Sequence, residues 1–287
     1  MAREITIIVG APRSGTNMLR DVLTSLDGHA TWPCDEINLL WRHGNRNHPD
    51  DELGVEQARP EVRAYLRNAF DRLGQRYGAD VVVEKTCATS LRVDFARAVF
   101  PEAKFLFITR DGVDAAASAM QRWNAPLDVR YTARKVRYVP PADVPFYAGR
   151  FASGVLKRRK ARTEQSGQLG SWWGPKPHDF RELMATRPLD EVCLMQWQRC
   201  VESSLTSFAT MPEDQWLHLA YEDYVAAPGD HTRRVLDFLG RPHAGVDEAV
   251  RSVSDRSVGK GRSSLSDEAV ARLDALAAAT TGAVRGI

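Results

Sequence analysis

Long hydrophobic runs are missing from this sequence. No apolar stretch approaches the roughly 20 residues that a helix needs to cross a bilayer, which excludes a transmembrane helix. The first apolar run, Ile5–Val9, has the length of a strand rather than the pattern of a secretory signal. Charge is nearly balanced, since 39 Lys and Arg face 37 Asp and Glu. We therefore expect a cytoplasmic protein, and the near-neutral chain argues against nucleic acid as a partner.

Cysteine is scarce and follows no functional pattern. The four cysteines form no C-x-x-C pair, and the seven histidines show no metal-ligand spacing. We expect thiols without a function in a reducing cytoplasm, and no metal site. Internal repeats and low-complexity linkers are also lacking. A chain of 287 residues would suit one large domain or two small ones.

The sequence does contain an alternation of strands and helices. Four apolar runs with charged or polar ends predict buried strands at 5–9, 80–86, 104–112 and 215–223. Periodic apolar residues predict helices at 18–26, 61–77, 90–100, 111–123, 189–211 and 232–239, and Ser266 is expected to cap a last helix. This order predicts a single α/β domain over residues 1–287, with a parallel β-sheet flanked by helices. Residues 125–179, where six prolines break the period, are predicted to be an insertion.

The charged ends of the predicted strands should lie close together. Ligands of parallel α/β sheets bind beyond the carboxyl ends of the strands. The strand ends with charged or polar residues are Arg13–Thr16, Glu84–Thr86, Thr109–Asp111 and Tyr221–Asp223. We expect a ligand site where they meet.

The first of these strand ends has the form of a phosphate-binding loop. Residues 10–16 keep the glycine spacing of such loops, whose amides attract an anion at the start of a helix. The lysine that these loops place before Ser or Thr is missing, and Arg13 supplies positive charge instead. An aspartate placed to hold Mg²⁺ is also missing, because Arg110 comes first in the charged end of the strand predicted at 104–112. The loop is therefore expected to bind phosphate through cations and amides.

Four segments, in order, resemble those of sulfotransferases that use 3′-phosphoadenosine 5′-phosphosulfate (PAPS). The family's 5′-phosphosulfate loop is similar to GAPRSGTNMLRDVL (10–23), and its 3′-phosphate motif to TRDGVDAAAS (109–118). Its Tyr-Glu-Asp segment resembles LAYEDYVAAPGDHTRRVLDFLG (219–240), and its C-terminal loop resembles SVGKGRSSLS (257–266). The resemblance covers nearly the whole chain except the insertion. It implies the P-loop NTPase-like sulfotransferase fold, and the loop and base region are closest to the tyrosylprotein and bacterial branch.

The resemblance implies PAPS as sulfuryl donor, adenosine 3′,5′-bisphosphate as product and no metal. The implied cofactor-binding residues are Arg13, Ser14, Gly15, Thr16, Asn17, Arg110, Ser118, Arg122, Tyr221, Ser257, Lys260, Gly261 and Arg262. Arg110 and Ser118 match the 3′-phosphate motif, and Arg122, one helical turn beyond Ser118, adds a second cation. Asn17 replaces a common threonine and Gly261 a common aromatic residue, which affects fine contacts with the cofactor.

Three residues are implied as catalytic. Arg13 and Lys85 would neutralise the leaving phosphate. Glu36 matches the glutamate base of the tyrosylprotein branch, and Asp35 beside it is the rival base. Cys87 stands where the cytosolic branch has a histidine, and a thiol with a reference pKa of about 8.5 is a poor general base.

The acceptor is expected to be a hydroxyl on a glycan, a glycolipid or another metabolite, with Trp172 and Trp173 available to stack on sugar rings. Tyrosine O-sulfation of a peptide is an alternative, as are a P-loop kinase and a non-catalytic nucleotide-binding module. Between Arg130 and Arg162, ten Lys or Arg residues face one acid, Asp143. This segment is either a solvated flap or a lid that recruits an anionic acceptor, and 146–160 also suits peripheral membrane contact.

Overall fold

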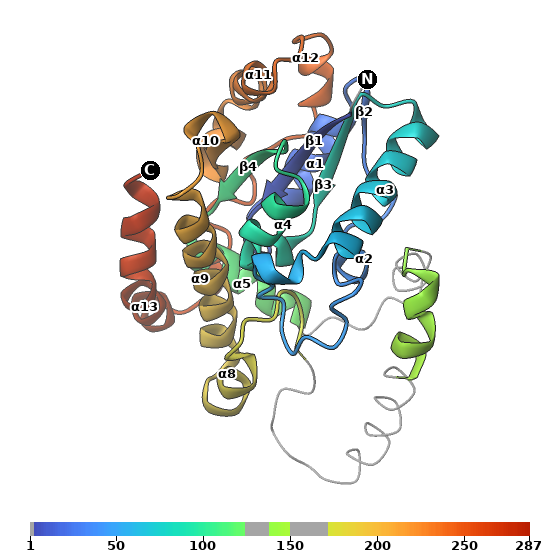
Figure 1. Cartoon of the computed structure of the whole chain (residues 1–287). Coiled ribbons are helices and arrows are strands. Elements are labelled where there is room, and N and C mark those ends of the chain that lie inside the picture. Colours follow the sequence, from blue (N-terminus) through green and yellow to red (C-terminus); the bar gives the residue numbers. More distant parts are fainter. Residues whose placement is uncertain (1–2, 124–137, 150–171) are drawn as a thin grey trace.

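Five parallel strands form one central sheet in this computed structural model, which describes residues 3–123, 138–149 and 172–287 (Figure 1). In order across the sheet they are β2 (His29–Ala30), β3 (Val81–Lys85), β1 (Glu4–Val9), β4 (Lys104–Thr109) and β5 (Trp216–Ala220). Ile8 pairs with both Lys85 and Leu106, so the carboxyl ends of the three inner strands reach one edge together. The predicted parallel sheet is confirmed.

Each strand turns alternate side chains to opposite faces of the sheet. Ile7 of β1 and Phe107 of β4 lie in one buried apolar cluster, whereas their neighbours Ile8 and Leu106 lie in another. The sheet is therefore buried on both faces. This explains why its strands are continuous apolar runs in the sequence, without the alternation of a half-exposed sheet.

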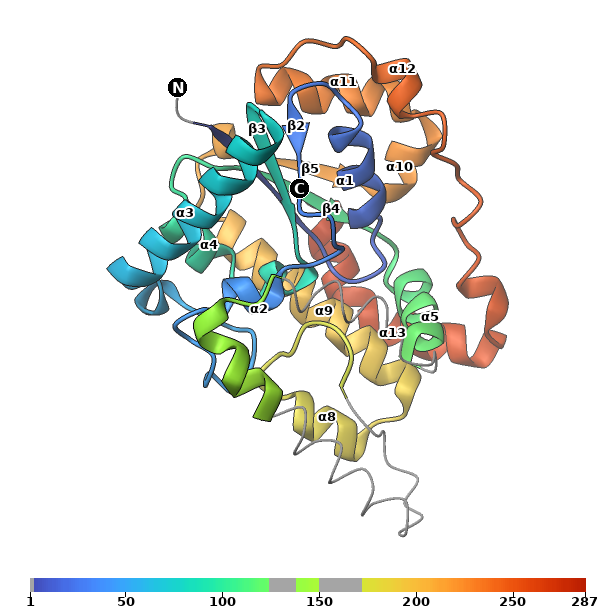
Figure 2. The same cartoon turned by 90° about the vertical axis from the view of Figure 1, so that its right-hand side faces the viewer.

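Helices form a layer on each face of the sheet (Figures 1 and 2). One layer holds α3 (Pro60–Tyr77), α4 (Val93–Val99), α5 (Gly112–Trp123), α9 (Leu189–Phe208) and α13 (Asp267–Arg285). The other holds α1 (Thr16–Thr24), α10 (Tyr221–Ala226), α11 (Pro228–Leu239) and α12 (Val246–Ala249). Two short helices, α2 (Asn38–Trp41) and α8 (Phe180–Thr186), lie towards the carboxyl edge of the sheet.

The ends of several helices follow the signals in the sequence. Gly78 and Gly240 end α3 and α11 in the left-handed conformation, with φ of 61° and 66°. At the start of α13 the Ser266 hydroxyl accepts a hydrogen bond of 3.3 Å from the Ala269 amide, as an N-cap does.

Several element boundaries differ from the prediction. The predicted strand 104–112 ends at Thr109, the last residue of β4. The predicted strand 215–223 ends at Ala220, because Tyr221 already begins α10. The predicted helix 90–100 begins only at Val93, after a 3₁₀ turn at Cys87–Leu91. The short β2 and α2 were not predicted at all.

Most of the predicted insertion lies outside the described residues, including 150–162, which carry much of its basic charge. Its described parts are 138–149, with helical backbone from 144, and 172–179. The assignment of residues 1–287 to a single domain with an insertion stays a prediction. In the ranges that the structure describes, every helix is too short or too polar to pass through a membrane.

Candidate functional site

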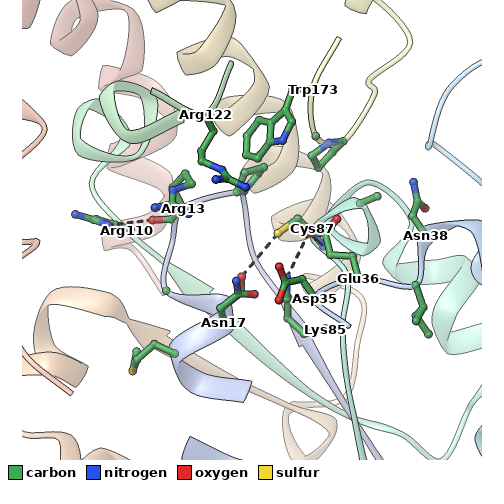
Figure 3. Close-up of a pocket in the computed structure, with 18 of the residues that line it drawn as sticks. Arg13, Asn17, Asp35, Glu36, Asn38, Lys85, Cys87, Arg110, Arg122 and Trp173 are labelled. Carbon is green, nitrogen blue, oxygen red and sulfur yellow. Dashed lines mark hydrogen bonds and ion pairs between the residues drawn. The ribbon is translucent and has the colours of Figure 1, made fainter. Parts of the chain in front are cut away.

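A pocket of about 570 Å³ opens at the carboxyl edge of the sheet. Its wall is built by the loop after β1, the segment 35–40, the end of β3, α5 and the start of α10. Figure 3 shows Arg13 and Arg110 on one side and Asn38 on the opposite side, with Glu36 and Cys87 between them. The predicted meeting of the charged strand ends is therefore observed. Among the described residues, His, Cys, Asp and Glu side chains do not gather in threes as metal ligands would.

The loop from β1 to α1 is shaped around its glycines. Gly15 precedes α1 with a φ of 87°, and a Cβ atom there would lie 2.4 Å from a ring carbon of Tyr221. Arg13 has a φ of 69°, which costs energy for a residue with a side chain. The hydroxyl of Ser14 is buried without a hydrogen-bond partner. An unpaired buried hydroxyl beside helix-start amides suits an anion that would complete its hydrogen bonding.

Positive charge is concentrated on one side of the pocket, which we call the arginine side: Arg13, Arg110 and Arg122. The Arg13 Nε donates to the Ser118 hydroxyl at 2.9 Å, and Arg110 donates to the Arg13 carbonyl at 3.1 Å. Burial lowers the pKa of Arg13, and the charges of Arg122 and Arg110 lower it further. In the described parts of the chain, neither Arg13 nor Arg122 has a carboxylate partner. This side of the pocket therefore favours a ligand with several negative charges.

Arg110 is fixed by its neighbours. Its guanidinium lies 4.5 Å above the Tyr221 ring, and it also donates to Asp114 at 3.4 Å and to the Ser257 carbonyl. The predicted cofactor residues Tyr221 and Ser257 thus reach Arg110 from distant parts of the chain. Only 8% of the Arg110 side chain is exposed, so its donors are held ready in one orientation.

The 257–262 loop is docked on α5 by Asp114, which the sequence analysis did not single out. The two oxygens of Asp114 accept from the amides of Gly259 and Arg262 at 2.6 and 2.9 Å. Gly261 is pressed against the same residue, since a Cβ there would lie 2.6 Å from the Asp114 Cα. The sequence marks Asp114 only as an acidic residue among the small residues of α5, which gives no indication that it binds the 257–262 loop.

Three predicted cofactor residues of this loop do not line the pocket: Lys260, Gly261 and Arg262. The guanidinium of Arg262 pairs with Asp111 and Asp274 at 2.6 and 2.7 Å, and Lys260 is exposed to solvent. Their assignment to the cofactor stays a prediction.

Lys85 and Glu36 form the centre of the pocket. The buried Lys85 Nζ lies 3.3 Å from the Glu36 Oε1, which also accepts from the Cys87 amide at 3.4 Å. Burial opposes the charged form of Lys85, but neighbouring groups outweigh it and raise the lysine's pKa, and among them Glu36 carries the negative charge at neutral pH. The rival carboxylate of Asp35 lies 3.6 Å from Arg20 instead. Glu36 is thus the carboxylate that contacts the predicted catalytic lysine.

The thiol of Cys87 is unsuited to act as a base. Burial raises its pKa to about 12, so it stays protonated at neutral pH. Its sulfur lies 3.7 Å from the Thr16 hydroxyl, where it packs behind the loop.

Another part of the pocket wall, which we call the aromatic side, is formed by Asn38, Leu39, Tyr138 and Trp173. Of the two tryptophans considered for stacking, only Trp173 lines the pocket. The Trp172 indole donates to the Pro175 carbonyl at 2.7 Å, and its ring packs against Trp123. Apolar rings beside an amide suit a ligand with both apolar and hydroxyl-bearing faces.

The comparison with known families decides between the candidate classes. A model of the Sulfotransferase family matches residues 6–165 and 171–245. The chain belongs to the sulfotransferase family. The match includes Arg13, Lys85, Arg110 and Tyr221, and it ends before the 257–262 loop.

Solved structures of other sulfotransferases share this fold. The Mycobacterium tuberculosis sulfotransferase STF1 aligns with a TM-score of 0.51 at 12% identity, over 92% of this chain and 78% of that one. The Mycobacterium avium sulfotransferase STF9 aligns with a TM-score of 0.51 at 12% identity, over 96% of this chain and 76% of that one. The sulfotransferase domain of the Synechococcus PCC 7002 olefin synthase aligns with a TM-score of 0.50 at 15% identity, over 96% of each chain. A search of curated proteins gave no match. At these identities, the structural likeness supports the sulfotransferase fold alone.

Proposed function

We propose that this sulfotransferase transfers the sulfuryl group of PAPS to an acceptor hydroxyl. One observation carries the proposal: Arg13, Arg110 and Arg122 surround the start of α1, where Ser14 keeps a buried hydroxyl without a partner. A donor with a 5′-phosphosulfate and a 3′-phosphate would bring the several negative charges that this side of the pocket favours.

The residues present fit the two ends of such a donor. The amides and hydroxyls of residues 14–17 would hold the 5′-phosphosulfate at the start of α1. Arg110 would hold the 3′-phosphate, together with Ser118, which the Arg13 side chain already contacts. Bound there, PAPS supplies an activated sulfuryl group.

The chain's own residues would divide the work of transfer. Glu36 would take the proton of the acceptor hydroxyl, while Arg13 and Lys85 would stabilise negative charge on the leaving phosphate. The contact between Lys85 and Glu36 puts the two functions side by side. Although Lys85 is buried, its pKa is raised and not lowered, so the lysine is charged at neutral pH and can stabilise the leaving phosphate.

For the acceptor, we propose a hydroxyl on a glycan, a glycolipid or another metabolite. Support comes from the aromatic side, where Trp173 and Tyr138 could pack on a sugar ring and Asn38 could bind its hydroxyls. An anionic acceptor and membrane contact are proposed from the sequence of the insertion alone. The four cysteines are thiols and none is in a disulfide, which suits a reducing compartment and supports the cytoplasm.

The test uses PAPS with an isotopically labelled sulfuryl group. The protein is incubated with a cell extract and with EDTA, and sulfated products are identified by mass spectrometry. Labelled products formed in EDTA would support the proposal. Transfer of phosphate from ATP that requires Mg²⁺ would point to a kinase. Binding of adenosine 3′,5′-bisphosphate in calorimetry, without turnover of any acceptor, would leave a nucleotide-binding module.

A further inference from the structure

Asp51 lies behind the aromatic side of the pocket, where three segments of the chain meet. It follows α2 in the chain, does not line the pocket and is only 2% exposed. A carboxylate so deeply buried must be compensated by partners, and those partners show which parts of the molecule it joins.

The first joined segment is α2, which follows the proposed base. One oxygen of Asp51 accepts from the Asn38 amide at 3.2 Å and from Arg42 at 2.8 Å. Arg92, which follows the 3₁₀ turn after β3, donates to the other end of the Asn38 amide at 2.6 Å. Both ends of the Asn38 side chain are therefore fixed, two residues beyond Glu36.

The residue between Glu36 and Asn38 is held as well. The Ile37 amide donates to the Thr86 hydroxyl at 3.1 Å, one residue beyond Lys85. The backbone that carries Glu36 is thus attached to the end of β3 on one side and to the Asp51 network on the other.

The second joined segment carries Trp173. The Asp51 amide donates to the Lys176 carbonyl at 2.8 Å, and the Lys176 amide donates to the second Asp51 oxygen at 3.0 Å. From the other side, Gln196 of α9 donates to the carbonyls of Trp173 and Pro175 at 2.7 and 3.0 Å. The wall that bears Trp173 is therefore held between Asp51 and α9.

Stability alone does not account for this network. Buried ion pairs repay little of the cost of removing charges from water, and apolar residues of similar size often stabilise a fold as well or better. The cost is visible at Arg92, where burial lowers the pKa to about 10 although Asp51 lies 3.8 Å away. What the network supplies is a fixed relation between segments that are distant in the sequence.

We propose that Asp51 is a positioning residue. It would hold the segment that carries Glu36 against the wall that carries Trp173, and so shape the aromatic side of the pocket, where the acceptor would bind. This inference rests on the proposed function of the same pocket. Within the described part of the chain, Asp51 contacts none of Arg13, Arg110 and Arg122, so it should act on the acceptor and not on donor binding.

The test is Asp51→Asn. An asparagine presents an NH₂ group either to the Lys176 amide or to the arginines, so one set of contacts must break. In hydrogen-exchange mass spectrometry we expect faster exchange in the peptides covering 36–41 and 172–178. The affinity for adenosine 3′,5′-bisphosphate should stay within about twofold of the wild-type value, since losing one hydrogen bond behind the aromatic side leaves the arginine side intact. With labelled PAPS and the extract as acceptor source, the acceptor KM should rise roughly 3- to 10-fold, as for one lost hydrogen bond.

Asp94→Asn is the matched control, because Asp94 accepts from Ser207 at 3.0 Å within the same helical layer, away from the pocket. If Asp51→Asn does not fold, Arg42→Lys keeps the charge beside Asp51 and removes the guanidinium fork, and it should give the same pattern more weakly. Exchange that rises evenly over the sheet, or stays unchanged at 36–41 and 172–178, would overturn the proposal. A wild-type protein that does not bind adenosine 3′,5′-bisphosphate would reject the PAPS proposal, while the exchange result would still decide the role of Asp51.

Discussion

At the scale of single residues, the two neighbouring carboxylates of the 35–40 segment have different surroundings. Asp35 is 43% exposed in its side chain and lies near Arg20, whereas Glu36 is 23% exposed and contacts Lys85. A base that must take a proton from a bound hydroxyl needs to face the pocket next to the charge that stabilises the leaving group. Glu36 meets this requirement better than Asp35.

Glu36→Gln tests this assignment. The variant keeps the size of the side chain and its acceptor oxygen but removes its basicity, so kcat should fall by about 10²–10⁴-fold, the range for a general base. Affinity for adenosine 3′,5′-bisphosphate should stay within a few-fold. Steady-state kinetics with labelled PAPS would measure kcat, and calorimetry would measure the affinity for adenosine 3′,5′-bisphosphate. Asp35→Asn is the control, and a larger loss in that variant would move the role of base to Asp35.

Arg110→Ala tests recognition of the donor. Removing a charge-assisted hydrogen bond to the 3′-phosphate should weaken binding of adenosine 3′,5′-bisphosphate by about 1.5–3 kcal/mol. Adenosine 5′-monophosphate lacks that phosphate, so its binding should change much less. Calorimetry with both ligands separates this effect from a general disturbance of the Tyr221 contact, and equal losses for the two ligands would contradict the assignment.

Residues at strand ends could be predicted from the strand pattern itself, whereas Glu36, Arg122 and Ser257, which also line the pocket, came from the family resemblance. Arg13 and Arg110 come after buried strands and Lys85 is the last residue of one, and parallel strands bring their carboxyl ends together. Asp51 and Asp114 were missed, because their partners Lys176 and Gly259 are 125 and 145 residues away in the chain. No local pattern of residues encodes such contacts.

At the scale of elements, the join between β1 and α1 depends on a glycine. Gly15→Ala would place a methyl group against the Tyr221 ring and force the left-handed backbone on a residue with a side chain. Such a backbone costs about 1–2 kcal/mol. Because Tyr221 supports Arg110, we also expect affinity for adenosine 3′,5′-bisphosphate to fall at least tenfold, about 1.4 kcal/mol.

Gly78→Ala is the matched control for this change. Gly78 has a φ of 61° and open space around its Cα, so the variant should lose stability through backbone strain alone and bind the nucleotide normally. Urea denaturation and calorimetry on both variants would show the difference. Normal nucleotide binding by Gly15→Ala would mean that the close approach of Tyr221 to the loop is not needed.

Long elements could be predicted from the sequence and short ones could not. The 18 residues of α3 and the 20 of α9 repeat the helical period several times, which makes the pattern visible. The two residues of β2 and the four of α2 span only about one period each, so no repeat of the pattern can be seen. The end of β5 was misplaced because α10 follows without a turn, and Tyr221 continues the apolar run into the helix.

At the scale of the whole molecule, the sheet separates two apolar clusters, and charged side chains are buried beside both. Arg20 of α1 is buried on one side of the sheet, and Glu84 and Arg92 are buried on the other. These charges lie next to the pocket rather than far from it. The molecule thus accepts a cost in stability where it builds its site, as functional sites commonly do.

Glu84 makes this cost measurable through pH. It is fully buried, and burial raises its pKa from 4.5 to about 7, although Thr86, Trp41 and Arg92 oppose the shift. Between about pH 4.5 and 7 the folded protein therefore binds more protons at this group than the unfolded chain, so its contribution to stability falls as pH rises and is constant above that range. The total loss should be about 3 kcal/mol.

Glu84→Gln removes this titration. In urea denaturation from pH 4.5 to 8, the wild type should lose about 3 kcal/mol of stability relative to the variant as pH rises to 7, and no more above it. Taking the difference between the two proteins cancels the titrations that they share, such as those of the histidines. Glu213→Gln, at an exposed position, is the control for removing a carboxylate that water solvates in both states. A difference that stays constant over the whole range would mean that Glu84 is ionised in the fold, held so by Arg92, and that burial does not control its charge.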